Sequence, residues 1–134
     1  MPGDYYQITP ANITLTVLQG ASYYRKWMLR YADTLLPFPF FESGVIAWHG
    51  RCMFRESYDA TTNLISLSDY NGGVFFELDS VNNEVYYGLL ISAGQTLALP
   101  AGKWVYDIEF ERISDSWIIR PQQGKVIISP EATK

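Results

Sequence analysis

The chain has 134 residues, of which 16% are aromatic, and this size and composition fit one strand-rich domain with a single core. Its formal net charge of −4 argues against a sequence-independent nucleic-acid binder, which needs a basic face to neutralise phosphates. The one cysteine, Cys52, excludes an internal disulfide, and no apolar stretch approaches the roughly 20 residues that a membrane-spanning helix needs.

The first half of the chain predicts an extended arm, three strands and an apolar loop. Residues 1–11 hold two prolines and one glycine, and we expect them to form the arm. Alternating residue types predict strands over 13–17, 23–31 and 45–56. The run Leu-Leu-Pro-Phe-Pro-Phe-Phe at 35–41 is nearly all apolar, yet its two prolines forbid a central strand or a helix. This run is therefore predicted to be a loop or a sheet edge.

The second half predicts further strands and one short helix. The expected strands cover residues 64–67, 74–78, 85–91, 104–111, 117–120 and 125–129. Asn71-Gly72-Gly73 is a strong turn signal. The helix candidate is 92–99, where Ser92 has the capping-box spacing to Gln95.

These elements predict an all-β fold. About eight or nine short strands, with turn signals roughly every 8–12 residues, are typical of an antiparallel sandwich or barrel. We expect an immunoglobulin-like antiparallel β-sandwich with one helical turn near 92–98. The predicted organisation is an arm over 1–11, the sandwich over 12–130 and a tail over 131–134.

The most regular stretch follows the helix candidate. After a Pro-Ala-Gly corner, aromatic and aliphatic residues alternate with Val105 and acidic residues up to Glu111. In immunoglobulin-like sandwiches an aromatic residue near the start of a late strand locks the corner behind it. The residues predicted to form the corner and the core-facing side of this strand are Pro100, Gly102, Trp104, Tyr106, Ile108 and Phe110.

Several runs resemble a known group of proteins. They are Ser92-Ala-Gly-Gln-Thr-Leu-Ala-Leu-Pro-Ala-Gly-Lys-Trp-Val-Tyr-Asp-Ile-Glu-Phe110, Gly124-Lys-Val-Ile-Ile-Ser-Pro-Glu-Ala-Thr133, Ile13-Thr-Leu-Thr-Val-Leu-Gln-Gly20, and Met53-Phe-Arg-Glu-Ser57 with 61–67. Together these runs resemble small virion proteins of tailed phages and prophages. Such proteins contain an immunoglobulin-like domain similar to the N-terminal domain of baseplate upper proteins. Between Leu35 and Gly44 the chain departs from this family, which usually has a polar turn there.

The resemblance implies a non-enzymatic structural protein of a virion, in the tail, the baseplate or the head–tail neck. It implies other virion proteins as partners, several copies in a symmetric assembly, synthesis in the host cytoplasm and location in the virion. A capsid decoration protein is an alternative. A second alternative is a module that binds a carbohydrate or receptor through exposed tyrosines such as Tyr58, Tyr70 and Tyr86. No cofactor, nucleic acid or membrane is expected as a ligand.

The candidate partner interface is aromatic, because aromatic side chains are common interface anchors. Phe38, Phe40 and Phe41 either fold back over the core as a lid or dock on a partner, and the sequence leaves both open. Tyr5 and Tyr6 of the arm are candidates to lie across a neighbouring subunit. The alternative for the arm is an ordinary frayed terminus.

The charged residues predict no catalytic centre. Strand alternation alone explains Asp107, Glu109 and Glu111 as a solvated face. The cations Lys26, Arg30, Arg51 and Arg55 are either a basic patch for an acidic partner or ordinary surface charge. His49 and Cys52 are three residues apart and should point to opposite faces of a strand, so a catalytic pair is not expected. An enzyme would require His49 in a cleft with carboxylates from other strands.

Overall fold

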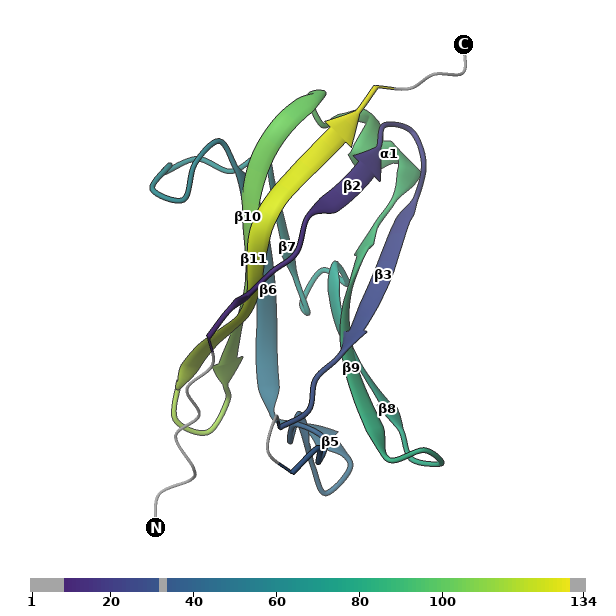
Figure 1. Cartoon of the computed structure of the whole chain (residues 1–134), viewed down its shortest axis with the longest axis vertical. Helices are drawn as coiled ribbons and strands as arrows, with labels where there is room; N and C mark the ends of the chain where they lie inside the picture. Colours follow the sequence, from purple (N-terminus) through teal and green to yellow (C-terminus); the bar gives the residue numbers. More distant parts are fainter. Residues whose placement is uncertain (1–8, 32–33, 131–134) are drawn as a thin grey trace.

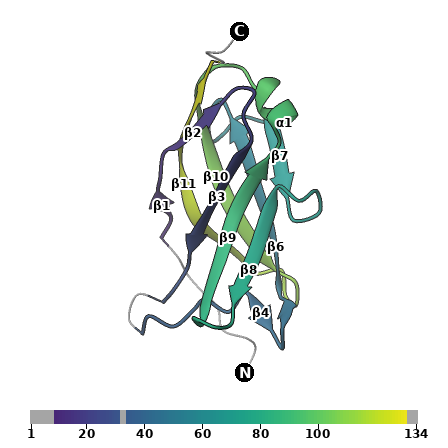
Figure 2. The ribbon, with the colours of Figure 1, turned by 90° about the vertical axis from the view of Figure 1, so that its right-hand side faces the viewer.

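Two β-sheets pack face to face, as two perpendicular views show (Figures 1 and 2). Apolar side chains fill the space between them. The computed structural model describes residues 9–31 and 34–130. The predicted all-β sandwich with one short helix is confirmed. The first described strand begins at Ala11, one residue before the predicted start of the sandwich.

The larger sheet has the strand order β1-β11-β10-β6-β7, and β2 also pairs with β11. Its members are β1 (Ala11–Asn12), β2 (Leu15–Leu18), β6 (Trp48–Arg55), β7 (Ile65–Ser68), β10 (Gly102–Arg112) and β11 (Ile118–Ser129). Along β6 every second residue is buried, so one face of the strand lines the core and the other faces outward.

The smaller sheet has the order β3-β9-β8 and faces the viewer in Figure 2. Its strands are β3 (Tyr23–Met28), β8 (Val74–Asp79) and β9 (Glu84–Ile91). The remaining elements are the hairpin of β4 (Phe41–Glu42) with β5 (Val45–Ile46), and the helix α1 (Ala93–Leu97). The predicted capping box is present, because the Ser92 hydroxyl accepts from the backbone of Gln95, and the Gln95 side chain accepts from the backbone of Ser92.

The N-terminal strands break the antiparallel pattern, since β1 and β2 both run parallel to β11. Gly124 makes their close approach possible. It has a φ of +154°, and a Cβ built on it would lie 2.4 Å from the backbone oxygen of Ile13. Only glycine fits this position, because any larger residue would meet backbone rather than a movable side chain.

The predicted strands 117–120 and 125–129 are one continuous strand, β11, and this corrects the sequence expectation. The strand passes through Pro121, which lacks the N–H that a regular ladder needs. Pairing with β10 shifts in register between Ile108 and Phe110, beside this proline. A bulge of this kind accommodates a proline within a strand.

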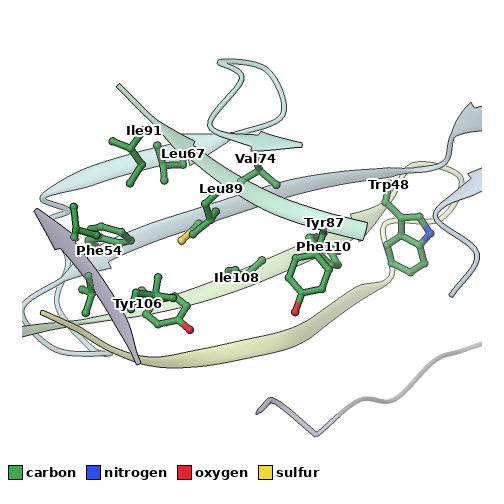
Figure 3. Packing of buried hydrophobic residues seen from close by; sticks show 14 of the residues in the cluster. Trp48, Phe54, Leu67, Val74, Tyr87, Leu89, Ile91, Tyr106, Ile108 and Phe110 are labelled. Atoms are coloured by element: carbon green, nitrogen blue, oxygen red, sulfur yellow. The ribbon is translucent and has the colours of Figure 1, made fainter. Parts of the chain in front are cut away.

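The core combines aromatic rings and aliphatic side chains from both sheets (Figure 3). Tyr106, Ile108 and Phe110 of β10 are buried there, whereas Trp104 is half-buried at the start of the strand. Trp104 holds the corner instead. Its indole Nε1 donates to the backbone oxygen of Pro100 at 3.1 Å, and Gly102 between them has a φ of +141°.

A Trp104→Phe substitution is expected to lower the free energy of unfolding by about 1 kcal/mol, because it removes the hydrogen bond to Pro100. Urea denaturation measures the change. Trp27→Phe is the matched control, since Trp27 Nε1 is buried and has no hydrogen-bond partner among the described residues. Equal losses in the two variants would show that the hydrogen bond does not stabilise the corner.

A buried chain of hydrogen bonds joins the two sheets to the N-terminal segment. The Tyr87 hydroxyl of β9 donates to Oε1 of Gln122 on β11 at 2.7 Å. Gln122 Nε2 donates to the Tyr106 hydroxyl at 2.8 Å, and that hydroxyl donates to the backbone oxygen of Ile13 at 2.6 Å. Burial raises the pKa of both tyrosines, because it disfavours the phenolate.

Candidate protein–protein interface

The apolar loop at 35–41 closes one end of the sandwich. Of the two alternatives that the sequence left open, Phe38 and Phe40 therefore form the lid over the core and do not offer a partner surface. These two side chains are only 2% and 0% exposed. The Phe40 ring packs against Phe110 with ring centroids 5.2 Å apart, and against Phe76 at 4.9 Å. Both phenylalanines therefore stabilise the core.

Backbone and indole hydrogen bonds fix this loop although it contains two prolines. The backbone N–H of Phe38 donates to the oxygen of Leu29 at 3.0 Å. The indole Nε1 of Trp48 donates to the backbone oxygen of Pro39 at 3.2 Å. The loop thereby crosses the end of the core without forming a regular strand.

Phe41 differs from its neighbours, because it is only half-buried and lines an open groove of about 360 Å³. The groove runs beside β8, between that strand, the β4–β5 hairpin and the turn after β7. Its lining residues are Phe41, Ile46, Asp69, Gly72, Val74, Phe75 and Phe76. The apolar part of this lining is suited to receive side chains of another protein segment.

The outer surface of the smaller sheet carries a group of apolar side chains that the sequence analysis missed, with the Lys26–Glu77 ion pair among them. We call it the aromatic face, and it consists of Tyr24, Met28, Phe75, Tyr86 and Leu90. The Tyr24 and Phe75 rings stack with centroids 5.4 Å apart and planes 7° from parallel. The alternation in β3 was a signal for this surface, but its partner strands became known only from the sheet order.

Gly88 makes room for the rings of the aromatic face. It lies on β9 between Lys26 of β3 and Phe75 of β8. A Cβ on Gly88 would lie 2.2 Å from Phe75 Cζ and 2.5 Å from the backbone oxygen of Arg25. The missing side chain therefore lets the Phe75 ring lie flat over the sheet.

The four cations named from the sequence do not form one basic patch. Lys26 pairs with Glu77 at 2.5 Å and lies over the Tyr86 ring, on the smaller sheet. Arg30 pairs with Glu84 at 2.6 Å. Arg51 and Arg55 instead belong to β6 of the larger sheet.

On the larger sheet the acidic residues of β10 engage arginines of its two neighbouring strands. Arg51 contacts Glu109, and it contacts Glu111 at 3.1 Å. Arg120 of β11 contacts Glu109 at 2.8 Å and Asp107 at 3.7 Å. Within residues 9–31 and 34–130, no group of three or more acidic, histidine or cysteine side chains is arranged to hold a metal ion.

His49 and Cys52 lie on opposite sides of β6. The Cys52 thiol is buried in the core, and this burial raises its pKa. His49 Nδ1 lies 2.9 Å from the Asp69 carboxylate, and its Nε2 lies 3.0 Å from the Tyr70 hydroxyl. The Asp69 carboxylate also accepts from the backbone N–H of Gly50 at 3.1 Å. These contacts fasten the turn after β7 to β6.

The tyrosines of the alternative binding module are not brought together. Tyr58 donates to the backbone oxygen of Gly124 on β11, and Tyr86 donates to Glu84 on β9. Tyr70 stacks on His49 of β6. Tyr5 and Tyr6 of the predicted arm, like the predicted tail 131–134, lie outside the described residues.

The edge of β7 is covered by a side chain of the turn that follows it. Asn71 Oδ1 accepts from the backbone N–H of Ser68 at 2.9 Å, and Asn71 Nδ2 donates to the oxygen of Ser66 at 3.0 Å. The amide of Asn71 thus occupies the place of a neighbouring strand. Such coverage prevents the edge from pairing with another chain.

Asn71→Ala is expected to expose this edge and to accelerate hydrogen exchange at the Ser68 amide. The substitution removes the acceptor that this N–H has in the native turn. Amide exchange followed by NMR measures the rate, with the Cys52 amide as internal control because β6 stays paired on both sides. An unchanged rate at Ser68 would contradict the capping role.

No protein-family model matches the chain, and no curated protein matches its sequence. Across the described residues, no helix has the length and apolar character required to cross a membrane. Neither comparison assigns a function to this chain.

Proposed function

We propose that this chain is a non-enzymatic structural protein of a tailed-phage virion, located in the tail, the baseplate or the head–tail neck. It would act through assembly contacts with other virion proteins and reach the virion after synthesis in the host cytoplasm. The observation that carries the proposal is the resemblance of 92–110 and 124–133 to small virion proteins. The chain also has the immunoglobulin-like sandwich that this resemblance implies.

The aromatic face supports a role in assembly. Monomeric soluble proteins rarely expose large contiguous apolar surfaces, and those that do generally use them for binding. Leu90, near the end of the middle strand β9, is 47% exposed, and the stacked rings of Tyr24 and Phe75 are part of the same surface. Aromatic side chains are enriched among residues that dominate binding energy in protein interfaces.

The surface of the larger sheet supports a structural rather than a catalytic role. Its arginines engage the carboxylates of β10, among them Glu109, which two arginines contact. Cross-strand ion pairs of this kind occupy the groups that acid–base catalysis would use. His49 is likewise held between Asp69 and Tyr70 at a turn.

Mass spectrometry of purified phage particles from the source tests the proposal, with copy number measured against the major capsid protein. A few copies per particle would support a tail, baseplate or neck component. Hundreds of copies would support the alternative of a capsid decoration or tail-lattice protein. Absence from the particles would overturn the virion role.

A surface variant links the aromatic face to this role. Leu90→Lys places a charge on this face, opposite Tyr24 near the end of β9, and is expected to reduce incorporation into particles. Val81→Lys is the matched control, because Val81 is 91% exposed in the β8–β9 turn, beyond the aromatic face. Equal incorporation of both variants would show that the aromatic face makes no assembly contact.

A further inference from the structure

Among the described residues, one side of the edge strand β3 has no hydrogen-bond partners. Just beyond the end of β3, the backbone N–H of Leu29 donates to the oxygen of Val85. With the register of the two strands, this bond identifies the residues of β3 whose backbone groups face β9. Because bonding alternates along an antiparallel pair, Tyr24, Lys26 and Met28 direct their backbone groups away from β9. No hydrogen bond to these groups is formed by the described residues.

The opposite edge strand, β8, is uncovered in the same way. Leu90 N donates to Gly73 O at 2.9 Å, so the alternation along β8 directs the backbone groups of Val74, Phe76 and Leu78 outward. These groups also lack a hydrogen-bond partner within the described chain. The groove lined by Phe41 and Ile46 runs along this edge.

The other edge strands of the fold differ from β3 and β8 in how their backbone groups are bonded. The edge of β7 is covered by Asn71. The N-terminal strands β1 and β2 pair with β11 and not with β3. An uncovered strand is a template for another strand, because its unpaired N–H and C=O groups provide the contacts.

The charges of the two edges are complementary. β3 carries Arg25 and Lys26, whereas β8 carries Glu77 and Asp79, and Lys26 and Glu77 already form an ion pair within one copy. The charges left for a second copy are therefore Arg25 on β3 and Asp79 on β8. Arg25 has no carboxylate partner among the described residues, and Asp69 lines the groove beside β8. Pairing β3 with a second β3, or β8 with a second β8, would bring like charges together. Pairing β3 with β8 brings opposite charges together.

We infer that β3 of one copy of this chain pairs with β8 of the next copy, joining the smaller sheets head to tail. Within one copy β3 and β8 run in the same direction, because both are antiparallel to β9. A rotation about an axis along the strands therefore pairs them in parallel. Head-to-tail contacts of this type form rings when the rotation closes. The inference rests on the proposed assembly role and identifies the partner in that assembly as a second copy of this chain.

Two edge-blocking variants test the head-to-tail arrangement. Met28→Pro blocks β3 and Leu78→Pro blocks β8; both side chains are exposed and both N–H groups point away from β9. Proline therefore removes a docking group without removing a bond within the sheet. In analytical ultracentrifugation we expect the wild type to form multimers and each variant alone to be monomeric. An equimolar mixture of the two variants should form one-to-one dimers.

Three outcomes would overturn the inference. The wild type could remain monomeric up to about 1 mM, a concentration at which even weak association is visible. One variant alone could still self-associate, or the mixture could give no dimer although both variants unfold cooperatively. If the variants do not fold, amide exchange of the wild type tests the edge pairing instead. Exchange at Lys26 and Phe76 must slow as protein concentration rises, while the Ser66 amide on the edge of β7 stays unchanged.

This experiment and the particle experiment fail separately. Dimers in the mixture, together with absence from phage particles, would refute the virion role and leave the pairing of the edges intact. Presence in particles, together with a monomeric wild type, would refute the edge pairing alone.

Discussion

Replacing Phe40 by alanine is expected to lower the free energy of unfolding by about 3–5 kcal/mol, the range found for large-to-small changes at buried aromatic positions. The Phe40 side chain is completely buried, and its ring contacts Phe76, Tyr87 and Phe110 from both sheets. The substitution leaves a cavity that rigid strands on two sides cannot fill by collapsing. Denaturant unfolding followed by intrinsic fluorescence measures the loss.

Phe41→Ala is the matched control, because the neighbouring ring is only half-buried and lines the groove beside β8. It should cost clearly less stability than Phe40→Ala, since less apolar surface returns to water. The difference separates a core role for the loop from a docking role. Similar small losses in both variants would contradict the burial of Phe40 and favour a loop that docks on a partner.

Stability is expected to fall steeply above about pH 10, the ordinary pKa of a tyrosine in an unfolded chain. Burial raises the pKa of Tyr87 and Tyr106 in the folded protein, so both phenols stay protonated there when the unfolded chain has already ionised. The unfolded state then binds fewer protons than the native state, and stability decreases as pH rises. Each phenol contributes about 1.4 kcal/mol per pH unit in this window, and its stabilisation is fully present below pH 10.

The Tyr87→Phe/Tyr106→Phe double variant identifies the source of this alkaline loss. At pH 7 it should be less stable than the wild type, because Gln122 loses its phenol partners and becomes an unsatisfied buried amide. Above pH 10 its stability should decline more gently with pH. Tyr24→Phe, on the aromatic face, should leave the slope unchanged. A double variant with the slope of the wild type would place the alkaline sensitivity in other groups.

Local periodicity was enough to predict most strands and the helix. In β6 the side chains alternate between core and surface as the sequence alternates, because neighbouring strand residues point to opposite faces. The capping box of Ser92 and Gln95 was also predictable, since its hydrogen bonds join residues three positions apart. The separation of His49 from Cys52 follows from the same alternation.

Other features depended on contacts between distant segments. The sequence predicted separate strands over 117–120 and 125–129, yet a register shift against β10 accommodates Pro121 within one strand. Gly124 gave no local sign that Ile13 would pass over it. The sequence did not decide whether Phe38 and Phe40 form a lid over the core or a docking surface, because an apolar loop with prolines is compatible with both. The tertiary structure decides it, since the loop covers one end of the core and both rings are buried.

In the candidate interface, too, some features follow from local sequence and others from contacts between distant segments. The sequence by itself determined a β-sandwich, its alternating faces and its stiff corner, because these depend on residues close together in the chain. Only the tertiary structure decided that Gly88 lies between the strands of Tyr24 and Phe75. It also decided that Asn71 covers β7, while no described residue covers the outer edges of β3 and β8. Strand order sets these neighbours, and strand order depends on the packing of residues far apart in the chain.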